Sequence, residues 1–84
     1  MHPLLQLLQG YSFELQVDIL VNAIHVTTHQ MLQLTERKLL YVEQGLVDSW
    51  EYLYAGYKHH CLALRTALEE LVAKEIDLPS WMAA

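Results

Sequence analysis

The sequence contains one cysteine, Cys61, among its 84 residues. A single cysteine excludes a disulfide within the chain, which is a common means of stabilising a domain this small. A lone thiol is typical of a reducing compartment. The start of the chain, Met1-His2-Pro3, lacks the basic segment of a secretory signal. We therefore expect a cytoplasmic protein.

Basic residues are also few, at five Lys and Arg against ten Asp and Glu, and the formal net charge is −5. Nucleic acids and anionic membranes are bound mainly through clustered basic side chains. Here only Arg37 and Lys38 are adjacent. Long hydrophobic runs are absent too, since no stretch approaches the roughly 18 to 20 apolar residues that span a bilayer. We expect neither a nucleic-acid nor a membrane partner.

Glycine and proline are scarce, at three and two residues, and they mark predicted helix ends. Pro3 suits the first turn of a short helix over residues 3–9, and Gly10 can end that helix in a left-handed conformation. Near the other terminus, Pro79 cannot continue a helix. Residues 77–84 are therefore predicted to form a loose tail.

Apolar residues recur at helical spacing over residues 13–44, which predicts one long helix with a bend near residues 27–28. Ser12 can cap its start, and Gly45 can close its end. Residues 13–19 also alternate apolar and polar side chains, as a half-buried strand does. The helical period extends over a much longer stretch, so we favour the helix and keep the strand as the alternative.

A tight turn and a second long helix, over residues 49–76, are predicted to follow. Asp48 and Glu51 have capping-box spacing, with Asp48 as the N-cap. A turn this short makes the helix fold back antiparallel. Its apolar residues alternate spacings of four and three, as in a coiled-coil seam: Trp50, Tyr54, Tyr57, Cys61, Leu64, Leu68 and Leu71.

These elements predict an all-α fold, a long antiparallel helical hairpin with a short N-terminal helix. The hydrophobic fraction is 54%, and the apolar arc is wider than the strip where two helices touch. The short helix is expected to cover a patch of Leu15, Ile19 and Val26. The remaining apolar surface fits a second copy, which would complete a four-helix bundle as a homodimer. The predicted interface residues are Leu20, Ile24, Met31, Leu34, Tyr41, Trp50, Leu53, Tyr54, Tyr57, Leu64, Leu68 and Leu71.

His25 and His29 are the best candidates for metal ligands, because a spacing of four residues puts both on one helical face. A zinc site needs three or four ligands, and the HExxH pattern is absent. Antiparallel pairing about the turn places His59 near Leu34, at least one turn from His29. The hairpin alone therefore completes no site, and no cofactor is expected.

No arrangement of nucleophile, base and acid is apparent, and Cys61 is more typical of a small buried hydrophobe than of a nucleophile. We expect no enzyme. The sequence favours a protein–protein interaction module (an adaptor, regulator or small chaperone) acting as a helical homodimer. Two alternatives stay open. One is a metal- or small-ligand-binding bundle that uses His25 and His29. The other is a strand-helix-helix transcriptional regulator in which residues 13–19 pair between chains.

Overall fold

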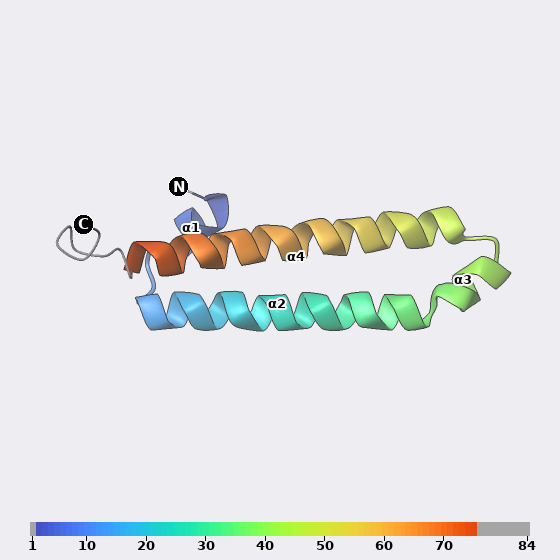
Figure 1. The fold of residues 1–84 in the computed structure, drawn as a ribbon, viewed down its shortest axis with the longest axis horizontal. Helices are drawn as coiled ribbons and strands as arrows, with labels where there is room; N and C mark the ends of the chain where they lie inside the picture. The colour runs from blue at the N-terminus through green and yellow to red at the C-terminus, as the bar shows by residue number, and fades with distance from the viewer. Residues whose placement is uncertain (1, 76–84) are drawn as a thin grey trace, which may run out of the picture.

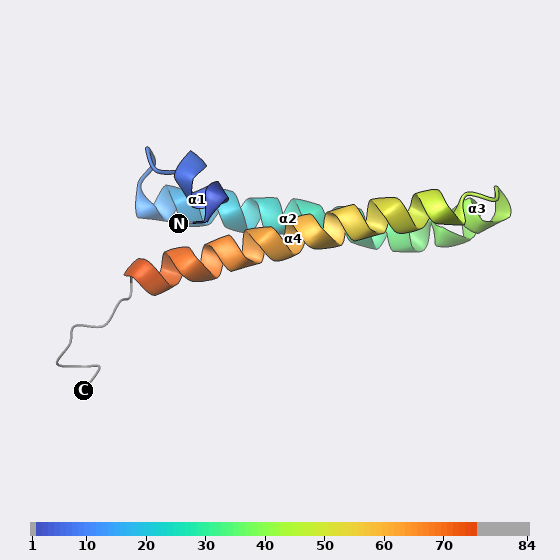
Figure 2. The ribbon, with the colours of Figure 1, turned by 90° about the horizontal axis from the view of Figure 1, so that it is seen from above.

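The computed structural model describes residues 2–75, and the regular structure in this range is entirely helical. The helices are α1 (Pro3–Leu7), α2 (Phe13–Glu36), α3 (Lys38–Glu43) and α4 (Val47–Glu75). α2 and α4 run side by side in opposite directions, with α3 at the closed end and α1 beside α4 at the open end (Figure 1, Figure 2). The all-α hairpin is confirmed, and the strand alternative is wrong. The predicted tail lies outside the described residues.

α2 begins where predicted because Ser12 caps it. The Ser12 Oγ accepts a hydrogen bond from the Leu15 N–H at 3.2 Å, and Glu14 lies in the first turn, where the helix dipole favours a carboxylate. α2 continues unbroken through residues 27–28. There the Thr27 hydroxyl donates to the Ala23 carbonyl at 2.8 Å, a bond made within the helix.

The prediction of one helix over residues 13–44 is wrong at Arg37, where α2 ends and α3 begins at the next residue. The Leu34 carbonyl accepts the Trp50 indole N–H at 2.6 Å. It also accepts the Arg37 N–H at 3.2 Å, a tighter bond over three residues. A continuous helix would use that carbonyl for the residue four positions later. The break therefore coincides with a contact between two helices.

The turn between α3 and α4 is closed by Gly45, whose φ of 72° is the only positive one among the described residues. The Leu46 N–H donates to the Tyr41 carbonyl at 2.8 Å, and the Gly45 N–H donates to the Val42 carbonyl at 3.1 Å. These two bonds make the Schellman motif, which occupies carbonyls at the end of the helix. The prediction for Gly45 is confirmed.

Two other predicted helix ends are wrong. α4 begins at Val47, so Asp48 lies in the first turn and is not the N-cap of a capping box. α1 ends at Leu7, and its last turn is closed by a bond of 3.1 Å from the Leu8 N–H to the Leu5 carbonyl. A three-residue bond of this kind needs no left-handed residue after it. Gly10 accordingly has no positive φ.

Replacing Gly45 with alanine is expected to lower the free energy of unfolding by about 1–2 kcal/mol, because a Cβ is strained at positive φ. The matched control is Gly10→Ala. Gly10 lacks a positive φ, and an added Cβ would meet nothing within 4 Å. It should be neutral or slightly stabilising. Urea denaturation followed by circular dichroism measures both, and equal effects would contradict the assignment of the turn.

The main buried cluster lies where α1 joins the long helices. It comprises Leu5, Leu20, Leu64, Ala67 and Leu71. Ala67 of α4 is fully buried and belongs to the same cluster as Leu5 of α1. The backbone N–H of His2 also donates to Glu70 Oε1 at 3.3 Å. α1 is therefore bound to α4 at this end of the hairpin.

This position of α1 contradicts the predicted patch. Leu15 and Val26 are exposed, and Ile19 is half-buried. The predicted pairing along the hairpin is also wrong by about one turn, because Thr28 Oγ1 lies 3.9 Å from Cys61 Sγ. Helical periodicity gives the face of a residue on its own helix. It does not specify which helix covers that face, or at what level.

Candidate functional site

The twelve predicted interface residues fall into two groups. Five are buried within the single chain and hold the hairpin together: Leu20, Leu34, Trp50, Leu64 and Leu71. The others keep surface that a second protein can contact. Leu53 is exposed, and the half-buried ones are Ile24, Met31, Tyr41, Tyr54, Tyr57 and Leu68.

Large apolar side chains are more often exposed than buried in residues 2–75. Seven apolar residues are buried, one of them the small Ala67, whereas twelve large ones are exposed. The exposed ones are Leu7, Tyr11, Leu15, Val26, Leu32, Leu39, Leu40, Val42, Leu46, Tyr52, Leu53 and Leu62. The Cα radius of gyration is 17.3 Å, against about 12 Å for a compact domain of this length. An elongated chain with so small a core leaves much apolar surface in water.

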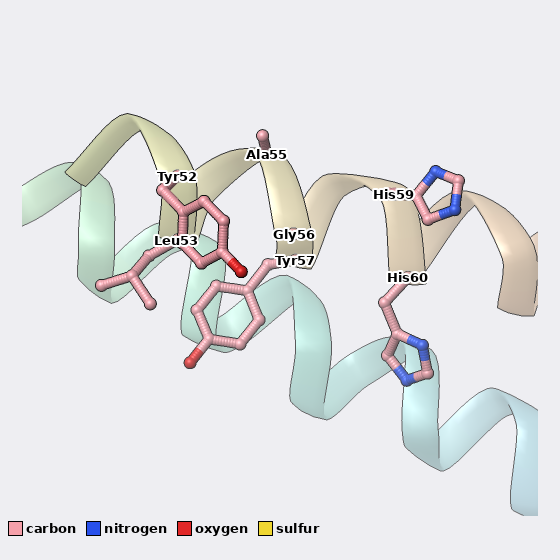
Figure 3. Close-up of a pocket in the computed structure, with 7 residues that line it drawn as sticks. All are labelled: Tyr52, Leu53, Ala55, Gly56, Tyr57, His59 and His60. Carbon is pink, nitrogen blue, oxygen red and sulfur yellow. The ribbon is translucent and has the colours of Figure 1, made fainter. Parts of the chain in front are cut away.

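A hollow of about 640 Å³ lies along one side of α4. We call this side of α4 the Gly56 face. The residues that line the hollow are Tyr52, Leu53, Ala55, Gly56, Tyr57, His59 and His60. Figure 3 shows Tyr57 and His60 extending toward α2, while Gly56 leaves the backbone bare between its neighbours. Tyr52 is 81% exposed and Leu53 is 38% exposed, so this apolar surface is open to a partner.

Gly56 lies in the interior of α4, where glycine costs about 1 kcal/mol relative to alanine. Its φ is not positive, and a Cβ built on it would meet nothing within 4 Å. Neither backbone conformation nor packing within the chain therefore requires a glycine here. A second molecule that approaches α4 closely at this position would account for the glycine, because a side chain would be in its way.

Charged side chains are absent from the lining of the Gly56 face. The charged residues of the same stretch are Glu51 and Lys58. At about 100° per residue they lie roughly 140° and 160° away from Gly56 around α4. One side of α4 thus carries charged side chains in contact with water. The other side carries tyrosine, leucine, alanine and histidine side chains.

A smaller hollow of about 200 Å³ adjoins the Gly56 face and shares Leu53 and Tyr57 with it. It extends across the seam to Tyr41 and Arg37, next to the break between α2 and α3. The Gly56 face therefore borders a hollow that reaches Arg37, the residue at which α2 ends.

The opposite side of the hairpin has another hollow, of about 250 Å³, which we call the Met31 groove. It is lined by Met31, Lys58, Cys61, Leu62 and Arg65. Its apolar floor thus lies between two cationic side chains. In this it differs from the Gly56 face.

The predicted metal ligands His25 and His29 are both exposed on α2. Within residues 2–75, no three His, Cys, Asp or Glu side chains are grouped in a way that could hold a metal ion. In the same range, no helix combines the length and the hydropathy needed to cross a membrane.

Comparison of the chain with family models, curated proteins and solved structures gives no match. The site therefore rests on its own geometry. Sequence reasoning placed Leu53 and Tyr57 in an interface but left out Tyr52, His59 and His60, which extend the same surface. The signal that could have identified them is their spacing of three and four residues on either side of Gly56.

Proposed function

We propose that this protein is a non-enzymatic protein–protein interaction module that acts as a helical homodimer. The observation that carries the proposal is the excess of exposed over buried large apolar side chains in residues 2–75, twelve against six. A single small domain rarely leaves so much apolar surface uncovered unless a partner binds it. Two hairpins packed together would form a four-helix bundle.

The stability of so small a chain also supports association. Cys61 is the single cysteine, so no internal disulfide stabilises the hairpin. The core is confined largely to the end that carries α1. Scaffolds of this size usually need a disulfide, a metal ion or a partner chain. We infer that a partner chain has this role, and that the protein works as an adaptor, regulator or small chaperone through the surface left over.

Sedimentation velocity over a range of protein concentrations tests the proposal. We expect a species of twice the 9.8 kDa chain mass, dissociating as the protein is diluted. Its thermal melting temperature should rise with protein concentration, because association stabilises only the folded state. A stable monomer at the highest concentrations, with an unchanged melting temperature, would contradict the proposal.

A further inference from the structure

Building on the dimer proposed above, we propose that the Gly56 face is the contact between two copies of this chain. The two α4 helices cross there in antiparallel orientation, with Gly56 of one copy at the two-fold axis against Gly56 of the other. This assigns a helix, a crossing point and a symmetry to the association.

Side-chain size along α4 favours a close crossing at this point. Gly56 has no side chain, and the space where a Cβ would stand is empty to 4 Å. Ser49 and Ala63, seven residues to either side, fall near the same strip of the helix and are small as well. The distance between two packed helices is set by the side chains at the contact. Small residues at the centre and bulky ones at the flanks allow a second helix to approach and then to interlock.

The face is complementary to itself under two-fold symmetry. In an antiparallel contact centred on Gly56, each residue before it meets the residue equally far after it in the second copy. Tyr52 then faces the second copy's His60, and Leu53 faces its His59. A tyrosine hydroxyl and a neutral imidazole can each donate and accept a hydrogen bond. No pair formed in this way brings two carboxylates or two cations together.

Charge favours this side of the hairpin over the opposite one. Each chain has a formal charge of −5, so two copies repel each other, and a contact between surfaces without acidic or basic side chains adds least to that repulsion. The Gly56 face satisfies this condition. The Met31 groove does not, because a two-fold contact centred on it would bring Lys58 and Arg65 of the two copies together.

The contact also continues a surface already used within the chain. α1 contacts α4 and shares a buried cluster with Ala67. Ala67 lies on the same side of the helix as Gly56 and roughly 16 Å further along it. α1 therefore leaves the crossing point free. A second copy would cover the part of this side that α1 does not reach.

Sedimentation equilibrium on the full chain and its variants tests the crossing point. Gly56→Leu fills the space at the axis and should raise the dimer dissociation constant by about 10- to 100-fold. Ala73→Leu is the matched control, because it adds a leucine at another exposed position of α4. That variant should dissociate as the original chain does. Circular dichroism of both variants should show unchanged helix content, since leucine is a strong helix former.

A third variant separates the failure of this inference from the failure of the proposed function. Leu62→Glu changes the Met31 groove, on the other side of the hairpin. We expect it to leave the dimer intact. A dimer that tolerates Gly56→Leu but dissociates with Leu62→Glu would overturn the Gly56 contact while the proposed function stands. If the original chain is a monomer at every concentration, both proposals fail.

Discussion

Replacing Leu20 with alanine is expected to lower the free energy of unfolding by about 3–5 kcal/mol. Leu20 is 2% exposed and joins the two long helices to α1 through its contacts in the buried cluster. Removing its side chain leaves a cavity lined by Leu5, Leu64 and Leu71. Because the core is so small, few other contacts can compensate for the loss.

Urea denaturation at a fixed protein concentration measures this effect, since association contributes to the stability. Leu7→Ala is the control, because it makes a similar truncation at a residue that is 77% exposed. It should change stability by less than about 0.5 kcal/mol. Similar losses for Leu20→Ala and Leu7→Ala would mean that α1, α2 and α4 do not share a core.

Replacing Trp50 with phenylalanine is expected to cost about 2–3 kcal/mol and to change the helix break at Arg37. The Leu34 carbonyl loses the indole N–H that donates to it at 2.6 Å and keeps the Arg37 N–H at 3.2 Å, and a hydrogen bond of this kind contributes about 1 kcal/mol. The indole is also stacked on Tyr54, with ring centroids 5.0 Å apart, and the Lys38 Nζ lies 4.6 Å from its ring centroid. A smaller ring weakens both contacts.

The structural consequence distinguishes this loss from ordinary destabilisation. Once the indole no longer donates to the Leu34 carbonyl, the Lys38 N–H can donate to it as in a continuous helix. Backbone chemical shifts of residues 36–38 should therefore move toward helical values in Trp50→Phe. Tyr54→Phe is the control, since it keeps a ring in the stack and should leave both the shifts and the stability nearly unchanged. If the shifts of residues 36–38 stay constant in Trp50→Phe, the indole is not the cause of the break.

The same break bears on binding at the closed end of the hairpin. α3 contains no buried residue and exposes Leu39, Leu40 and Val42. A straight continuation of α2 would carry these residues along the line of the seam. In the structure they lie on α3, next to the turn that carries the exposed Leu46. The closed end of the hairpin therefore carries exposed apolar side chains beside the contact between Trp50 and Leu34.

Local features of the sequence determined the helical content of the chain and most of its boundaries. Ser12 supplies a cap and Gly45 a left-handed residue, and each acts on backbone groups only a few positions away. The helical periods of the two long segments are local in the same sense. These features were enough to predict the hairpin and the apolar seam of α4.

The tertiary structure alone decided the helix break at Arg37, the level at which α4 pairs with α2, and the position of α1. Trp50 of α4 donates a hydrogen bond to Leu34 of α2, and Leu5 of α1 lies in the same buried cluster as Ala67 of α4. The structure also shows that, within residues 2–75, no neighbouring atom lies within 4 Å of the position that a Cβ would take at Gly56. Contacts between distant residues compete with local preferences, and periodicity along one helix carries no information about the neighbour that will cover it.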